Sequence, residues 1–180
     1  MQDEKEFIKE LLNPKTQNEA FKILVQQYQK QLYFNIRNIV LNHDDAHDVL
    51  QNTFIKVFQN INKFKGDSKL LSWMYRISTN EAISFLNLKA KKNNTTSQDL
   101  QLKIIENLEA DVFFESSEIQ IKLQQAIAIL PTKQQLVFKM KYFEELKYEQ
   151  ISEILGTSVG ALKANYHIAT KKIEEFLKFN

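Results

Sequence analysis

The chain has 180 residues, enough for one larger domain or two small ones, and its 43% hydrophobic content excludes wholesale disorder. It has no cysteine, which excludes disulfides and thiolate metal sites, and its three glycines and two prolines argue against a turn-rich sheet protein. The net charge of +2 indicates no particular partner until its distribution is considered.

Positive and negative charges are segregated along the chain. Residues 63–92 hold seven Lys and Arg against two acids, residues 98–118 hold six acids against one Lys, and residues 156–173 hold three Lys and no acid. Two basic segments around an acidic one indicate two contact surfaces for an anion such as DNA. The charged start, residues 1–12, and the absence of a run of about 20 apolar residues predict a cytoplasmic protein without membrane insertion.

Three helices are predicted in the first half of the chain. Apolar residues recur every three or four positions at about 21–40, 46–61 and 69–91. Thr16 and Glu19 form a capping-box pattern before the first helix, and Asn42 to Asp44 form a turn that holds the N-cap of the second.

The middle of the chain, residues 93–118, is polar and acidic and lacks periodicity, which predicts a flexible linker with one short helical piece around 102–108. Beyond it, helical spacing returns in four stretches, at about 119–130, 132–143, 148–155 and 159–177. No convincing strand pattern occurs. We therefore expect an all-α fold of two small helical domains, 1–92 and 119–180, joined by the acidic linker.

Residues 147–163 have the pattern of a helix-turn-helix. Ser152 is small enough for two helices to cross closely, and Gly156 can adopt the positive φ that the turn requires. The second helix would enter the DNA major groove. The side chains off its apolar face are Ser158, Ala161, Lys163, Asn165, His167, Lys171 and Lys172. Asn can read adenine and Lys can contact guanine or phosphate, although a plain helical hairpin without a ligand would share the pattern.

Two motif sets together resemble one family, the bacterial sigma factors of the extracytoplasmic-function (ECF) type. The second half is similar to that family's promoter-recognising domain at Leu130-Pro131, Val137-Phe138, Tyr148, Ile151-Ser152, Ile154-Leu155-Gly156, Ser158, Gly160 and Leu162-Lys163. In the first half, Asp45 to Phe54 resembles the polymerase-binding helix, and Phe64 to Gly66 with Trp73 to Ala82 resembles the promoter-melting segment.

The resemblance implies a protein that binds core RNA polymerase and directs promoter recognition, melting of the −10 element and transcription initiation. It implies no enzymatic activity, cofactor or small-molecule substrate, because the polymerase holds the catalytic metal. Besides the polymerase and promoter DNA, many family members have an anti-sigma protein as a partner. The family often has Arg where Asn165 and Ile168 stand, so the promoter sequence does not follow from these residues.

The resemblance also assigns residues to three contacts. The polymerase-binding set is Asp45, Asp48, Gln51, Asn52 and Phe54. The −10 set is Tyr75, Arg76, Asn80, Lys89, Lys91 and Lys92. The −35 set is Ser158, Ala161, Lys163, Asn165, His167 and Lys171. Trp73 and Tyr75 cannot both face DNA from one helix, so we expect Trp73 to be the buried ring and Asn80 to read a base.

Two other interpretations are open at this point. His43 and His47, four residues apart with Asp44 and Asp48 beside them, have a spacing that can hold zinc or iron, but no further cluster of ligands completes the shell. An ordinary helix-turn-helix regulator would dimerise and bind a palindrome. The asymmetric layout of two different basic segments favours a monomer on a two-part site.

Overall fold

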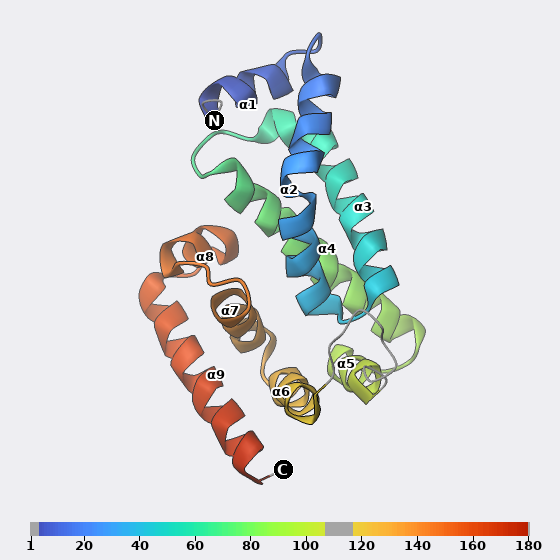
Figure 1. The fold of residues 1–180 in the computed structure, drawn as a ribbon, viewed down its shortest axis with the longest axis vertical. Coiled ribbons are helices and arrows are strands. Elements are labelled where there is room, and N and C mark those ends of the chain that lie inside the picture. The colour runs from blue at the N-terminus through green and yellow to red at the C-terminus, as the bar shows by residue number, and fades with distance from the viewer. Residues whose placement is uncertain (1–3, 107–116, 180) are drawn as a thin grey trace.

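The computed structural model describes residues 4–106 and 117–179, and every regular element in these ranges is helical (Figure 1). The elements are α1 (Glu4–Leu12), α2 (Gln17–Val40), α3 (His43–Asn60), the 3-10 turn η1 (Ile61–Lys63), α4 (Leu70–Lys92), α5 (Ser97–Glu106), α6 (Glu118–Ala128), α7 (Thr132–Tyr142), α8 (Tyr148–Leu155) and α9 (Val159–Phe179). The all-α prediction is confirmed.

Helices α2, α3 and α4 form a bundle, and α1 lies across one end of it (Figure 1). The sequence patterns did not predict α1. One of its residues caps another helix: the Glu4 carboxylate accepts a hydrogen bond from the Leu70 amide at 2.7 Å. This bond satisfies one of the backbone donors at the start of α4 that have no partner within their own helix.

The predicted caps had different outcomes. The cap expected within Asn42 to Asp44 is confirmed at Asn42, whose side chain accepts a hydrogen bond from the Asp45 amide at 2.9 Å. The Thr16–Glu19 capping box is wrong, because the Thr16 hydroxyl donates instead to the Glu10 carbonyl at 2.8 Å. The Thr16 hydroxyl therefore bonds to a carbonyl at the end of α1 and does not cap the start of α2.

The first part of the predicted linker is a packed helix, and this corrects the expectation of a flexible segment. In α5, Leu100, Gln101 and Ile105 are buried, and the Gln101 side-chain amide donates to the Ile39 carbonyl of α2 at 3.1 Å. The predicted helical piece at 102–108 overlaps only the end of α5. Positions 107–116 of the linker lie outside the described residues.

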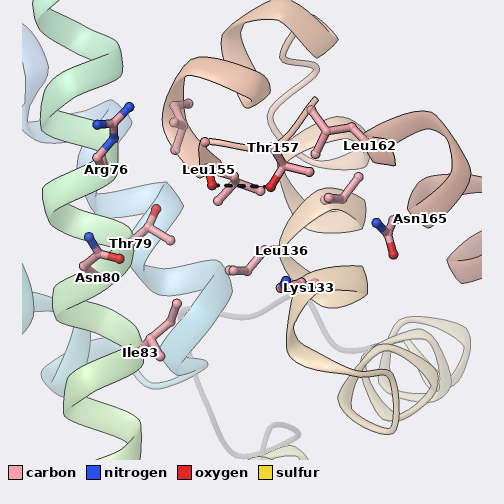
Figure 2. A pocket seen from close by; sticks show the side chains of 13 residues that line it. Arg76, Thr79, Asn80, Ile83, Lys133, Leu136, Leu155, Thr157, Leu162 and Asn165 are labelled. Carbon is pink, nitrogen blue, oxygen red and sulfur yellow. Dashed lines mark hydrogen bonds between the residues drawn. The ribbon is translucent and has the colours of Figure 1, made fainter. Parts of the chain in front are cut away.

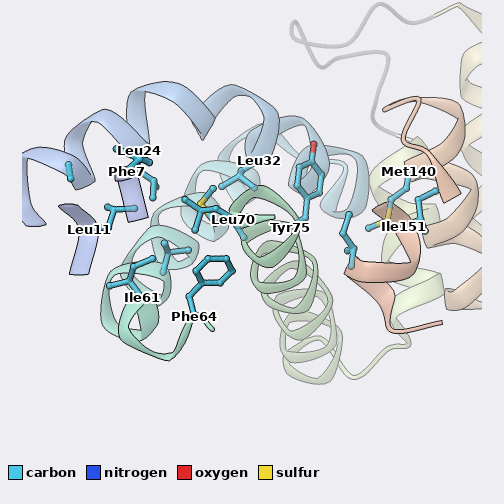
Figure 3. Close-up of a cluster of buried hydrophobic side chains, with 14 of the residues drawn as sticks. Phe7, Leu11, Leu24, Leu32, Ile61, Phe64, Leu70, Tyr75, Met140 and Ile151 are labelled. Atoms are coloured by element: carbon cyan, nitrogen blue, oxygen red, sulfur yellow. The ribbon is translucent and has the colours of Figure 1, made fainter. Parts of the chain in front are cut away.

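The two halves of the chain share buried side chains rather than standing apart. One apolar cluster joins Leu32 and Tyr75 of the first bundle to Met140 and Ile151 of the second half (Figure 3). Leu136 of α7 packs into a second cluster whose other fully buried members come from α2 to α5. The second half also has its own core between α6, α7 and α9.

The turn of the helix-turn-helix depends on a left-handed residue. Gly156 has φ 63° and ψ 31°, and its amide donates to the Ser152 carbonyl at 2.9 Å. A Cβ at this position would meet no neighbouring atom, so the backbone conformation alone opposes a side chain. We expect Gly156→Ala to lower the free energy of unfolding by about 1 kcal/mol, which thermal denaturation measures.

A matched control lies four residues away. Gly160 stands in the first turn of α9, without a positive φ, and a Cβ there would also meet open space. Gly160→Ala should not lower the melting temperature, because alanine favours the helix. Equal losses from both variants would contradict the role given to the backbone of Gly156.

Candidate nucleic-acid and partner interfaces

The hinge of the helix-turn-helix is buried and its second helix is accessible. Ile151 and Leu162 are fully buried at the contact of α8 with α9. The Ser158 hydroxyl accepts a hydrogen bond from the Ala161 amide at 3.4 Å at the start of α9. The remaining members of the predicted −35 set are largely outward: Ala161, Lys163, His167 and Lys171 are exposed. Ser158 and Asn165, which also belong to this set, form hydrogen bonds with backbone groups of α9.

Lys163 and Asn165 differ in what holds them. The Lys163 ammonium lies 5.8 Å from the centroid of the Tyr148 ring of α8, within the range of a cation–π contact, and the residue is exposed. The Asn165 amide donates to the Ala161 carbonyl at 2.9 Å, one turn earlier in the same helix. Reading a base edge would require Asn165 to give up that bond, whereas the contact of Lys163 with an aromatic ring leaves its three donors available to phosphate or guanine.

Helix α4 presents Arg76 and Asn80 on one exposed face. The Arg76 guanidinium donates to the backbone carbonyl of Glu153 in α8. Asn80, Arg76 and, from α9, Asn165 line one cavity of about 400 Å³ between the two halves (Figure 2). The predicted −10 and −35 residues therefore face a common space in this structure.

The burial of Tyr75 and Trp73 is the reverse of what the sequence predicts. Tyr75 is 4% exposed and belongs to the shared core, whereas Trp73 is only partly buried and packs on Phe64, with ring centroids 5.4 Å apart. The prediction that Trp73 is the buried ring is wrong. Tyr75 shares a buried cluster with Met140 and Ile151 of the second half, which lie to one side of it in Figure 3, and sequence periodicity within α4 carries no signal of that packing.

The basic end of α4 is partly neutralised. The Lys89 ammonium lies 2.5 Å from a carboxylate oxygen of Asp45, whose side chain is mostly buried. The resemblance assigns Asp45 to the polymerase contact and Lys89 to the −10 contact. In the structure the two side chains pair with each other and hold α3 against α4. Lys91 and Lys92 are exposed at the last turn of the helix and are the basic residues of this end that solvent reaches most freely.

One face of α3 carries the predicted polymerase residues. Asp48, Gln51 and Asn52 are exposed at helical spacing, and Phe54 is half-buried. Beside them, side chains of α2 and α3 line a hollow of about 370 Å³, formed by Phe21, Val25, Gln51, Phe54, Ile55, Phe58 and Gln59. Ile55 is 49% exposed and Phe58 39% exposed.

The sequence patterns did not indicate that Ile55 and Phe58 lie on a surface. Phe58 counts as a core position by its spacing, and Ile55 has no partner in the helical repeat. An apolar surface beside an acidic one suits a partner that offers both apolar and basic side chains. The mixture of Asp48 with Ile55 and Phe58 therefore defines a candidate docking surface, here called the α3 surface.

The histidines of α3 are arranged as an aromatic cluster. The Tyr33 hydroxyl and His43 Nδ1 share a hydrogen bond of 2.7 Å, and the His43 and His47 ring centroids are 4.5 Å apart. In residues 4–106 and 117–179, no group of three or more His, Asp or Glu side chains is arranged to hold a metal ion. Among the same residues, no helix is long and apolar enough to cross a membrane.

Two ionisable side chains are buried where the halves meet. Lys139 of α7 is 3% exposed, and burial lowers the pKa of its ammonium to about 7. The carboxylate oxygens of Glu144, after α7, are also buried, and this raises the pKa of Glu144 to about 7, although the facing Tyr75 and Asn38 side chains counteract part of the rise. Neither group belongs to a predicted contact set.

Both halves of the chain match known family models. Residues 24–92 match "Sigma-70 region 2" and residues 120–173 match "Sigma-70, region 4". The chain is 30% identical over 169 residues to the RNA polymerase sigma-H factor of Pseudomonas aeruginosa, covering 88% of this chain and 86% of the relative. It is 30% identical over 173 residues to the ECF RNA polymerase sigma factor SigW of Bacillus subtilis, covering 91% and 92%.

Two solved structures share the fold. CnrH in complex with the cytosolic domain of CnrY has a TM-score of 0.70 at 17% identity, covering 99% of this chain and 98% of that one. The sigma factor RpoE in complex with the anti-sigma factor NepR from Bartonella quintana has a TM-score of 0.64 at 21% identity, covering 89% and 98%. At these identities the likeness concerns the fold alone.

Proposed function

The chain belongs to the family of ECF-type RNA polymerase sigma factors, and on this premise we propose that it binds core RNA polymerase in the cytoplasm and directs promoter recognition, −10 melting and transcription initiation. The observation that carries the proposal is the pairing of two different surfaces on one chain. A helix-turn-helix with outward lysines suits duplex DNA, and the acidic and apolar α3 surface suits a protein partner.

In the proposed −35 contact, α9 enters the major groove from its N-terminal end. Lys163, His167 and Lys171 are exposed there and supply donors for phosphates or base edges. Ala161 is exposed in the first turn of the helix and offers a methyl group to thymine. Ser158 acts first as the cap that fixes the start of α9.

In the proposed −10 contact, Asn80 reads a base and Arg76, Lys91 and Lys92 neutralise the DNA backbone. All four are exposed on α4. Melting requires the energy of unstacking to be recovered by contacts with extruded bases. The partly buried ring of Trp73, packed on Phe64, is a better stacking platform than Tyr75, whose ring is buried.

For the polymerase contact, we place Asp48, Gln51, Asn52 and Phe54 together with Ile55 and Phe58. Asp45 supports this surface from beneath by pairing with Lys89. The division into a polymerase and −10 domain (1–92), a linker (93–118) and a −35 domain (119–180) remains a prediction. An anti-sigma protein remains a proposed further partner, because RpoE of similar fold is in complex with the anti-sigma factor NepR.

The role of α9 is tested by Lys163→Ala. Removing one phosphate or base contact should weaken promoter binding of the polymerase complex by about 1 kcal/mol, which is roughly a fivefold loss. Association with core polymerase alone should not change, because Lys163 lies in the other half from the α3 surface. Filter binding to promoter DNA and sizing chromatography with polymerase measure the two quantities.

Lys178→Ala is the matched control, since Lys178 is exposed near the end of the same helix and belongs to no predicted contact. It should leave both quantities unchanged. If Lys163→Ala weakened polymerase association as much as promoter binding, the division of roles between the halves would be wrong. A chain that bound a palindrome as a dimer, without polymerase, would support the rival regulator.

A further inference from the structure

We infer that the cavity between α4, α5 and α7 is a binding site for a small monocarboxylate with a short apolar chain. The volume of this cavity is about 210 Å³, and residues of both halves of the chain line it. Arg76 and Asn80, which line the larger cavity of Figure 2, are not part of it. The site goes beyond the proposed function, because ligand binding here involves neither polymerase nor DNA.

One buried charge lines this cavity. Lys139 of α7 is 3% exposed, and among the described residues no hydrogen bond or ion pair reaches its ammonium. Burial lowers the pKa of Lys139, and no neighbouring acid counteracts that effect. The other described residues that line the cavity have no ionisable side chain. A buried ammonium without a counter-ion is costly, so an anion that enters the cavity supplies the partner that Lys139 lacks.

The start of α7 faces the same cavity. Thr132 is the first residue of α7 and lines the cavity, and Pro131 before it provides no side-chain cap. The first amides of a helix have no partner within the helix and favour negative charge.

Thr132 and Lys139 share one face of α7. They are two helical turns apart, which corresponds to about 10 Å along the axis. Side chains of a helix lean toward its start, so the long side chain of Lys139 shortens the gap to Thr132. A carboxylate between the two residues would contact the ammonium of Lys139 on one side and the hydroxyl of Thr132 on the other.

A second helix begins at this cavity. Ser97 and Gln98 are the first two residues of α5, and both line the cavity. Asp99, the acidic residue of the same turn, accepts a hydrogen bond from the Thr96 hydroxyl at 2.7 Å and does not line the cavity. The starts of α5 and α7 therefore both favour an anion here, and no acid among the lining residues opposes it.

The polar walls are held in place without a ligand. The Gln135 side-chain amide donates to the carbonyls of Ala128 and Leu130 at 3.0 and 2.8 Å. The Gln101 side-chain amide donates to the Ile39 carbonyl at 3.1 Å. Groups that are ordered before binding lose little conformational freedom when a ligand enters. The cavity is therefore preorganised for a small ligand.

The size and the apolar wall of the cavity define the ligand. At roughly 30 Å³ for each water molecule, the volume corresponds to about seven non-hydrogen atoms. Ile83, Leu86 and Leu136 form an apolar wall, which suits an aliphatic chain. A phosphate would place further oxygens against that wall, where they would have no partners. A carboxylate on a chain of about four carbons satisfies both the charge and the volume.

Isovalerate is the probe for this site. Isothermal titration calorimetry with the full chain, at about pH 6 in a buffer without carboxylates, measures its binding while both Lys139 and the probe are charged. One isovalerate should bind per chain. Isovaleramide has the same shape without the charge and should bind at least about tenfold more weakly. Isovalerate should lose at least about tenfold in affinity for Lys139→Met and several-fold for Thr132→Val, which removes only a hydroxyl.

Lys178→Met removes an exposed charge from α9 and is the control, so it should bind isovalerate as the unmodified chain does. No saturable binding by the folded chain, or equal affinities of Lys139→Met and the unmodified chain, would overturn the site. Tighter binding of phosphate or chloride than of isovalerate would overturn the assignment to a carboxylate. These titrations contain no polymerase and no promoter DNA, so their failure would leave the proposed function standing.

Discussion

Lys139→Met should raise the free energy of unfolding by about 2 kcal/mol at pH 7, because it removes a buried charge that has no partner, and replacing even a paired buried charge by apolar side chains of similar volume is neutral or stabilising by roughly 1–4 kcal/mol. Lys139 is 3% exposed and has no ion-pair partner among the described residues. Denaturant titration monitored by helical circular dichroism measures the change, which for 180 residues corresponds to a rise in melting temperature of about 4–8 °C.

The same substitution should change the pH dependence of stability. The folded-state pKa of Lys139 is lowered by burial to about 7, against 10.5 for an unperturbed lysine. Between these values the unfolded chain binds the extra proton, so this residue makes the free energy of unfolding rise as pH increases from about 7 to 10. Lys139→Met removes that contribution, and its advantage over the unmodified chain should shrink over the same interval.

Lys178→Met again supplies the comparison, because Lys178 is exposed. Its stability should follow that of the unmodified chain at every pH. If Lys139→Met destabilised the chain at pH 7, the ammonium of Lys139 would have a stabilising partner, and its assignment as an unpaired buried charge would be wrong.

Asp48→Arg should reduce association with core polymerase by at least about tenfold, since like charges brought together in an interface cost several kcal/mol and 1.4 kcal/mol is a factor of ten. Asp48 is exposed on the α3 surface, beside Gln51 and Asn52. It stands beyond the first turn of α3, so the helix dipole contributes little to its role. Fluorescence anisotropy of labelled chain titrated with core polymerase measures the affinity.

Glu174→Arg controls for the change of two charge units, because Glu174 is exposed on α9, far along the chain from the α3 surface. It should leave polymerase affinity within about twofold, since an exposed charge outside an interface has little effect at physiological salt. Circular dichroism should show both variants folded. Unchanged affinity for Asp48→Arg would mean that the acidic face of α3 is only solvated surface.

Local patterns predicted what depends on neighbouring residues along the chain. The helices, the cap at Asn42 and the left-handed turn at Gly156 follow from spacing, capping chemistry and backbone freedom, and the structure has all three. The family resemblance also came from short motifs, and the family models match both segments that carry them.

Features that depend on contacts between distant segments were not predictable from those patterns. Thr16 bonds to the end of α1, Asp45 pairs with Lys89, and Tyr75 is buried by α7 and α8. Each outcome requires knowing which helices meet. The polar sequence of α5 likewise conceals Leu100 and Ile105, which become core residues only because α4 and α6 lie beside them. Lys139 is the strongest example, because a lysine in a sequence predicts a side chain exposed to solvent.

The most direct test of sigma activity is run-off transcription with the purified chain and core RNA polymerase on a pool of promoter fragments from the host. The proposed function predicts transcripts that appear only with the chain, begin at defined promoters, and reveal shared −35 and −10 sequences. They should be weakened by Lys163→Ala and by Asp48→Arg. No chain-dependent transcript, together with no complex between the folded chain and polymerase on a sizing column, would contradict it.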